Sequence, residues 1–161
     1  MQIDGMEFTF PDNWEVEKYD DWVFYKKRFQ SIGVGQKAVD IVAKDPRNTL
    51  WWIEVKDYRI YKRTKVIDLA DEVAIKVRDT MAGLLATSVN AETTERAKAK
   101  KFIRIKKIRI VLQLEQPRVN SKLFPRAINL ADVQQKLRKS IKAIDPHPRV
   151  TEGRNQHVSI P

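Results

Sequence analysis

Cysteine is absent from the 161 residues, and this absence excludes two classes of structure. A chain without thiols forms neither a disulfide framework nor a thiolate zinc site. The absence also fits a reducing compartment. Only two histidines occur, His147 in a turn-rich segment and His157 near the C-terminus, and their spacing does not match a zinc motif.

Glycine and long apolar runs are scarce as well. The five glycines match neither a Walker nor a dinucleotide-binding loop, and no serine lies in a nucleophile elbow. No run of about 18 apolar residues is present to cross a bilayer. The N-terminus is acidic and lacks the basic start and apolar centre of a signal peptide. We therefore expect a soluble, cytoplasmic protein with no membrane partner.

Positive charge is what the chain has in excess. The formal net charge is +10, although residues 1–29 contain seven acids and only four bases. A basic body of this kind predicts a polyanionic partner, with nucleic acid first. Hydrophobic residues make up 42% of the chain, enough for a globular core. We expect a single domain over residues 1–152 and a flexible C-terminal tail over 153–161.

The pattern of apolar residues predicts a mixture of helices and strands. Strands are expected at 6–10, 37–43, 50–61 and 103–114, with a short last one near Val150. A turn at Asp45–Asn48 is expected to join the second and third of these strands as a hairpin. Helices are expected at 13–29, 66–89, 91–101 and 129–143, and 116–127 is expected to be a loop. Asn129 is the expected N-cap of the last helix. The expected buried stripe of the 66–89 helix is Val66, Ala70, Val73, Val77, Met81 and Leu84. The segment Trp22–Tyr25 is also good strand material. The order predicts an α/β fold with a mixed central sheet flanked by helices.

Three charged residues lie in two of the most apolar strands. Asp40 is in AVDIVA, and Glu54 and Lys56 are in WWIEVK. Side chains two apart on a strand point to the same face, so Glu54 and Lys56 share one side of the sheet. A charge in such surroundings is costly unless it is paired or holds a metal. Two converging carboxylates suit Mg²⁺ or Mn²⁺, which prefer oxygen ligands.

The spacing Asp40, thirteen residues, then Glu54-Val55-Lys56 resembles the signature of the PD-(D/E)XK nuclease superfamily. Val39 stands where the family name has proline. The resemblance covers residues 13–114 and implies a restriction-endonuclease-like αβββαβ core. It also implies Mg²⁺-dependent hydrolysis of phosphodiester bonds, with Asp40, Glu54 and the Val55 carbonyl as metal ligands and Lys56 activating a metal-bound water.

The same resemblance asks for an acid on the first helix. Glu17 is the candidate for this further catalytic residue, with Asp20 and Asp21 behind it. The competing interpretation is that Asp40, Glu54 and Lys56 form a buried salt-bridge cluster with no chemistry.

Basic segments provide candidate nucleic-acid contacts. Residues 56–65 contain five bases and two tyrosines, and residues 96–109 contain eight bases and no acid. Solvated surface is the alternative for both segments. The candidate residues for contacting phosphates are Arg59, Lys62, Arg63, Lys76, Arg104, Lys106 and Lys107.

The resulting hypothesis is a Mg²⁺-dependent endonuclease or exonuclease that cleaves DNA. The alternative is a catalytically inactive nuclease-like protein that binds nucleic acid or serves as an accessory subunit of a defence or repair complex. Either could form a homodimer or bind a partner protein.

Overall fold

A five-stranded mixed sheet forms the centre of the computed structural model, which describes residues 1–61, 63–117, 128–153 and 157–159. Along the sheet the strands are β3 (Glu15–Lys18), β4 (Ile41–Lys44), β5 (Thr49–Asp57), β6 (Lys107–Glu115) and β7 (Arg149–Thr151). The first two pairings, β3 with β4 and β4 with β5, are antiparallel. The pairings of β5 with β6 and β6 with β7 are parallel.

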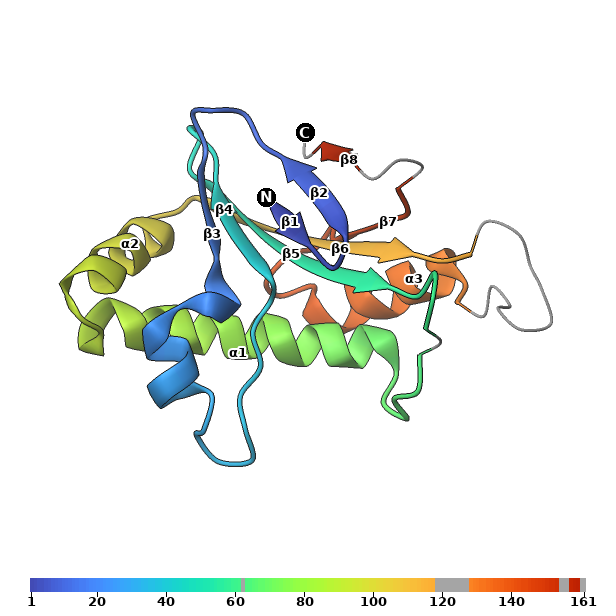
Figure 1. Ribbon diagram of the computed structural model, residues 1–161, viewed down its shortest axis with the longest axis horizontal. Coiled ribbons are helices and arrows are strands. Elements are labelled where there is room, and N and C mark those ends of the chain that lie inside the picture. The colour runs from blue at the N-terminus through green and yellow to red at the C-terminus, as the bar shows by residue number, and fades with distance from the viewer. Residues whose placement is uncertain (62, 118–127, 154–156, 160–161) are drawn as a thin grey trace.

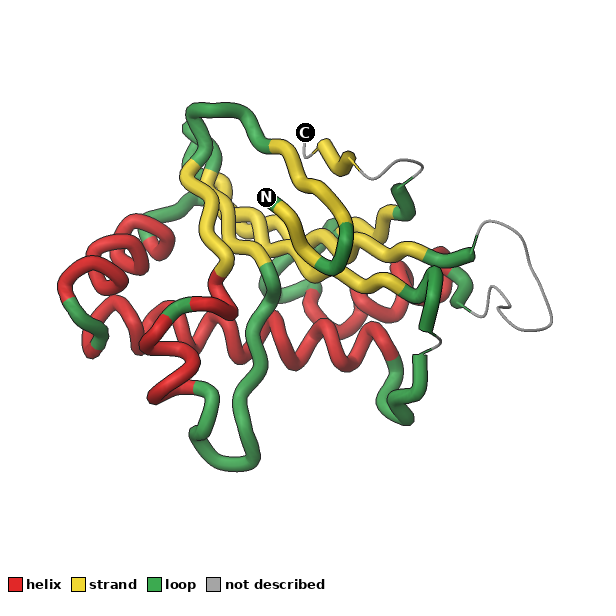
Figure 2. Tube along the Cα trace, in the orientation of Figure 1, coloured by secondary structure: helices red, strands yellow, loops and turns green. Residues whose placement is uncertain are grey.

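The helices cover one face of this sheet, and a smaller sheet covers the other (Figures 1 and 2). The helical elements are η1 (Tyr19–Asp21), η2 (Tyr25–Phe29), α1 (Leu69–Asn90), α2 (Thr93–Ile103) and α3 (Leu130–Ile141). The smaller sheet consists of β1 (Gln2–Ile3), β2 (Met6–Thr9) and β8 (His157–Ser159). Each face of the central sheet therefore has its own apolar core, and the expected α/β class is confirmed.

The prediction of one helix over 13–29 is wrong, because residues 15–18 form strand β3. Val16 pairs with Ala43 and packs in the core beneath the small sheet, so tertiary pairing outweighs the helical spacing. Two short helical pieces follow. The second ends with the Gln30 N–H donating to the Tyr25 carbonyl five residues earlier, which is π-helical spacing. The expected αβββαβ order is therefore wrong in detail: β3 precedes the short helical pieces, and two strands, β4 and β5, lie between them and α1.

Strand β4 begins at Ile41, four residues later than the sequence predicted. The N–H groups of the preceding segment are bonded to α1 instead of to a strand. The Lys37 N–H donates to the Asp79 carboxylate and the Val39 N–H donates to the Thr80 hydroxyl, each at 3.0 Å. Asp40 thus lies at the bend between the segment that is bonded to α1 and strand β4 of the sheet.

Helix α1 follows the predicted stripe only in part. Ala70, Val73, Val77 and Leu84 are buried, but Val66 precedes the helix and is fully exposed, and Met81 is 40% exposed. The helix begins at Leu69 because the Asp68 carboxylate caps it by accepting the Ala70 N–H. The cap predicted at Asn129 is present on α3, where its side chain accepts the Ala131 N–H.

Two predicted segments fall partly beyond the described residues. The loop expected at 116–127 is described only as far as 117, and the tail expected at 153–161 is described only at 153 and 157–159. Residues 157–159 form β8, which pairs in parallel with β2. Of the helices in the described part of the chain, none has the length and apolar character needed to cross a bilayer.

A substitution at Gly83 of α1 tests how closely η1 and η2 pack on that helix. A Cβ at this position would lie 2.3 Å from the Tyr19 hydroxyl and 3.1 Å from a Phe29 ring carbon. Gly83→Ala should therefore destabilise the fold by about 1–3 kcal/mol, although alanine favours helix by about 1 kcal/mol. Urea unfolding measures the difference. In a Tyr19→Phe background the cost should shrink, and an unchanged cost would contradict this packing.

Candidate functional site

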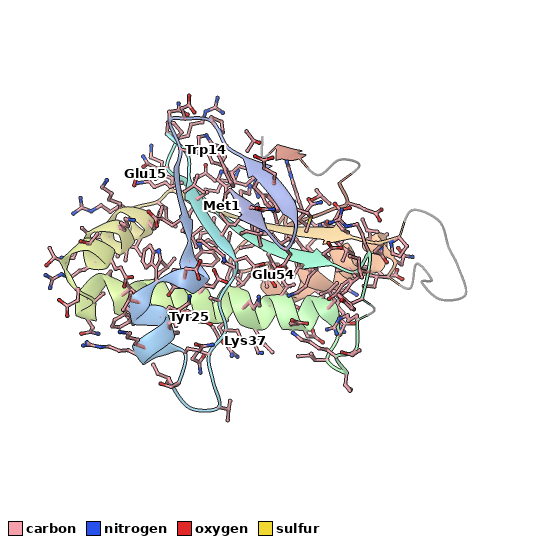
Figure 3. The ribbon with its side chains drawn as sticks, in the orientation of Figure 1. Met1, Trp14, Glu15, Tyr25, Lys37 and Glu54 are labelled. Atoms are coloured by element: carbon pink, nitrogen blue, oxygen red, sulfur yellow. The ribbon has the colours of Figure 1, made fainter. Side chains whose placement is uncertain are left out.

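Four charged residues singled out from the sequence form, together with a fifth, a largely buried cluster between β5 and α1. We define the acid–lysine cluster as Asp40, Glu54, Lys56, Glu72 and Lys76. The first lies just before β4, the next two lie on β5, and the last two lie one turn apart on α1. Figure 3 shows Glu54 between the sheet and α1. The prediction that Glu54 and Lys56 share a face, with Asp40 beside them, is confirmed by these contacts.

Glu54 is the centre of the cluster and has no solvent exposure. Its Oε1 lies 2.6 Å from the Lys56 Nζ and 2.6 Å from the Lys76 Nζ. Its Oε2 has no hydrogen-bond partner among the described residues. Burial, together with the negative charge of Asp40, raises the pKa of Glu54 to about 7, while the two lysines oppose that rise. Glu54 therefore changes its protonation state near neutral pH.

Lys56 connects Glu54 to a second buried carboxylate. Its Nζ lies 3.5 Å from the Glu72 Oε1. Burial would lower the pKa of Lys56, but the adjacent Glu54 and Glu72 carboxylates raise it above its usual value. The Lys56 ammonium is thus charged and held between two acids.

Glu72 binds the basic segment that follows β5. Arg63 donates to the Glu72 Oε2 at 2.9 Å, and Lys65 pairs with the Oε1. Burial would raise the pKa of Glu72, but the Lys65 hydrogen bond and the neighbouring lysine charges hold it below its usual value. Arg59 makes its own ion pair with Asp57 at 2.6 Å. The segment predicted to bind phosphates thus neutralises acids of its own chain, while Lys62 lies outside the described residues.

Asp40 links the bend before β4 to both β5 and α1. Its Oδ2 accepts the Val55 N–H at 2.7 Å, and its Oδ1 lies 3.5 Å from the Lys76 Nζ. The observed bond at Val55 therefore involves its N–H, and ligation of a metal by its carbonyl stays a prediction. Lys76 is among the residues that the sequence suggests for contacting phosphates, a role that needs an accessible side chain. It is instead half-buried and bridges Asp40 and Glu54.

A polar pocket of about 530 Å³ opens beside the cluster. Asp20, Asp40 and Lys76 line it, together with Tyr25 and Lys37, which Figure 3 shows near α1. The buried Asp20 Oδ1 has no hydrogen-bond partner in the described part of the chain. Burial and the nearby Asp40 charge raise the pKa of Asp20. Asp20, the second choice from the sequence, is therefore the η1 acid next to Asp40.

Glu17, the first choice, lies elsewhere. It is on β3 instead of a helix, and its carboxylate pairs with Lys98 of α2 and accepts from the Trp22 indole. Its register partner on β4 is Val42, two residues beyond Asp40. These contacts join Glu17 to α2 and not to the acid–lysine cluster, because the strand β3 replaces the expected first helix.

The expected Mg²⁺ or Mn²⁺ can be tested against this geometry. The carboxylates of Asp40 and Glu54 suit a hard cation, and the Glu54 Oε2 has no hydrogen-bond partner among the described residues. The Lys76 ammonium, however, already provides positive charge between them. Across residues 1–61, 63–117, 128–153 and 157–159, no three acid or histidine side chains gather as a metal site. Asp40 and Glu54 would hold the ion, so a metal must compete with Lys76.

A second candidate site is the basic end of the molecule, where α2 meets β6. Arg104, Lys106 and Lys107 are exposed there. A pocket of about 550 Å³ includes Lys106 and Lys107 in its lining. Arg109 and His147 line the same pocket, and Arg109 pairs with the buried Asp145 at 2.7 Å.

Comparison with known proteins points away from nucleases. No family model matches the chain, and no solved structure matches it. It is 32% identical to a cysteine–tRNA ligase of Neisseria meningitidis serogroup A over 164 aligned residues. That alignment covers 80% of this chain and 23% of the ligase, so the chain spans about a quarter of the length of this relative.

The assignment to the PD-(D/E)XK nucleases is therefore wrong, and with it the DNA-cleaving function and the nuclease-like accessory subunit. The finding that overturns it is the similarity to a tRNA ligase. The physical reason for the error is that buried acids next to lysines satisfy a short motif equally well as an ion-pair network. That Asp40, Glu54 and Lys56 are site residues stays a prediction, now without nuclease chemistry.

Sequence reasoning overlooked three buried acids that organise these sites: Glu72, Asp79 and Asp145. Glu72 could have been found, because it lies four residues before Lys76 and beside Val73 of the buried stripe. Asp145 gives no such signal. It looks like a turn residue, yet its carboxylate accepts the buried Ile110 N–H of β6.

The raised pKa of Glu54 predicts a specific pH dependence. The folded protein holds a proton on Glu54 that the unfolded chain releases near pH 4.5, so stability falls as pH rises from about 4.5 to about 7. Glu54→Gln removes this titration. Urea unfolding from pH 5 to pH 8 should show wild type losing up to about 3 kcal/mol relative to the variant. A difference that stays constant with pH would contradict the raised pKa.

Competition with Lys76 predicts how a metal would bind. Mn²⁺ should raise the melting temperature of Lys76→Met more than that of wild type, because the variant lacks the ammonium between the carboxylates. Differential scanning fluorimetry with and without Mn²⁺ measures both shifts. Asp40→Asn is the control and should show no shift. If Mn²⁺ stabilises neither wild type nor Lys76→Met, the metal prediction is wrong.

Proposed function

We propose that this chain is an RNA-binding module whose ligand is tRNA. The observation that carries the proposal is the 32% identity, over 80% of the chain, to a protein that carries the name cysteine–tRNA ligase. The chain matches only 23% of that relative. The proposed role is to bind tRNA for a synthetase-related process.

The charge distribution supports a phosphate-binding role for the basic end of the molecule. The chain has a formal net charge of +10. Lys98 and Lys101 of α2 pair with Glu17 and Glu15. Arg104, Lys106 and Lys107 follow them and are exposed, and among the described residues none of these three forms an ion pair.

The shape at this end also suits a nucleic-acid backbone. Two exposed lysines border a pocket that also includes the exposed ring of His147. The Lys106 N–H donates to the Asn48 carbonyl at 2.9 Å, which fixes the start of β6 against the β4–β5 turn. A phosphate in this pocket would meet cations on an ordered backbone, so less entropy is lost when it binds. Such contacts give affinity that decreases as salt increases.

RNA is favoured over the DNA expected from the sequence because of the ligase similarity. Phosphate contacts alone do not distinguish the two polymers, since both carry the same backbone charge. A tRNA differs in its folded shape and its 2′-hydroxyls. The test therefore compares tRNA with a DNA duplex of equal length.

We predict that Lys106→Ala/Lys107→Ala weakens tRNA binding by about tenfold. The slope of the logarithm of affinity against the logarithm of salt concentration should become shallower, by the amount expected for the loss of about two phosphate contacts. Fluorescence anisotropy with a cysteine tRNA, a second tRNA and the DNA duplex measures both effects. Lys26→Ala/Lys27→Ala, with the same change in net charge, is the matched control and should bind like wild type. Equal losses in both double variants, or DNA binding as tight as tRNA binding, would sink the proposal.

A further inference from the structure

The pocket between the start of β6 and the turn after α3 has two chemically different halves. Its apolar half consists of Ile105, Ile108, Ile144 and Pro146, and its cationic half consists of Lys106, Lys107 and Arg109. His147 completes the lining, and among the lining residues that the structure describes none is an acid. The volume of about 550 Å³ is within the range of about 300–1,000 Å³ that is usual for small-ligand sites. A phosphate alone would use only the cationic half.

The apolar half of the pocket is a supported surface. Ile105, Ile108 and Ile144 are partly buried and pack against the core between the central sheet and the helices. Pro146 is exposed and adds a rigid ring to the same lining. Because the three isoleucines rest on the core, they are already ordered before a ligand arrives. A flat apolar group can therefore lie against them at little cost in side-chain entropy.

The buried Asp145 holds the turn that carries His147 against β6. Its carboxylate accepts the His147 N–H at 2.9 Å, the Ile110 N–H at 2.8 Å and a bond from the Arg109 guanidinium at 2.7 Å. The backbone that carries the His147 ring is thus fixed to the sheet, while the ring itself is exposed. An aromatic ring held in this way is a platform on which an unstacked base of RNA can lie.

Strand β6 has an open edge beside this pocket. Strand β7 pairs with β6 only along residues 111–113, so residues 107–110 have no strand on that side within the described part of the chain. The Ile110 N–H points to this edge, where it meets Asp145. Backbone groups alternate along a strand, so the Ile108 N–H points to the same edge. The pocket therefore offers a neutral backbone donor in addition to its cations.

We propose, resting on the RNA-binding role given above, that this pocket binds one unpaired nucleotide of the RNA. The base lies against the apolar half and the His147 ring, and the phosphate lies against Lys106 and Lys107. A nucleotide combines a flat base with an anionic phosphate, so it uses both halves of the pocket at once. A base inside a duplex is stacked between its neighbours and cannot enter, so the site selects nucleotides that are unpaired.

The charges around the pocket determine which way the nucleotide lies. Arg109 is paired with Asp145, so the acid beneath the turn neutralises this cation. Lys106 and Lys107 are exposed, and among the described residues neither forms an ion pair. The strongest attraction for a phosphate is therefore at the start of β6. The base is left on the side of the turn that carries Pro146 and His147.

Fluorescence anisotropy with two RNA duplexes tests this site. One duplex is blunt, and the other has the same stem with a single-stranded 3′ overhang. Wild type should bind the overhang duplex about tenfold more tightly, because a stacked base contributes a factor of that order. His147→Ala should remove this advantage and leave binding of the blunt duplex unchanged, whereas His147→Phe should keep it because the ring remains. Measurement at pH 8 keeps the imidazole neutral, so a loss reports stacking instead of charge.

Tyr61→Ala is the matched control, because it removes another exposed ring and should keep the overhang preference. An overhang that adds no affinity in wild type overturns the nucleotide site, as does a preference that survives His147→Ala or disappears in Tyr61→Ala. If tRNA binding still depends on Lys106 and Lys107 in that case, the proposed function stands. If the overhang is preferred but tRNA binds no more tightly than the DNA duplex, the nucleotide site stands and tRNA is the wrong ligand. If neither RNA binds, both are wrong.

Discussion

Burial of the Glu54 carboxylate between the sheet and α1 is the constraint on which the rest of the structure depends. A buried charge without partners would cost several kcal/mol, so the fold must bring cations to it. Lys56 comes from the same strand and Lys76 from the helix packed over it. The pairing therefore fixes the position of α1 on β5. The two lysines also limit the rise in the pKa of Glu54, which is about 7. The charge at this contact between α1 and β5 therefore changes near neutral pH.

The contact between α1 and β5 also determines the path of the segment that precedes β4. Asp79 and Thr80, one turn after Lys76, hold the N–H groups of residues 37 and 39 on the helix. The chain turns into β4 only at Asp40, whose carboxylate then caps Val55 on β5. Asp40, Glu54 and Lys76 are consequently linked to one another by direct contacts. The polar pocket lies beside them, next to the segment that leaves α1 and enters β4.

Charge is divided among three different tasks in this protein. Arg63 and Lys65 neutralise the buried Glu72, and Lys98 and Lys101 hold β3 to α2 through Glu17 and Glu15. Within the described part of the chain, Arg104, Lys106 and Lys107 near the start of β6 form no such ion pair, and all three are exposed. A count of basic residues along the sequence cannot separate these groups, because the separation depends on which acids fold next to them. The segment 56–65 resembles a nucleic-acid surface in the sequence, yet Lys56, Arg59, Arg63 and Lys65 pair with acids of the chain itself. Their binding to nucleic acid stays a prediction.

The sequence by itself determined the α/β class, the hairpin around Asp45–Asn48, the Asn129 cap and the shared face of Glu54 and Lys56. Each of these depends on local periodicity or on residues close in the chain. Only the tertiary structure decided that residues 15–18 join the sheet, that Lys76 lies between two carboxylates, and that Asp145 supports β6. Those outcomes depend on pairings between distant segments, and the free energy of such pairings is absent from any local pattern. The short acid-x-lysine motif misled for the same reason: it fixes which charges are buried, whereas their neighbours in space decide what those charges do.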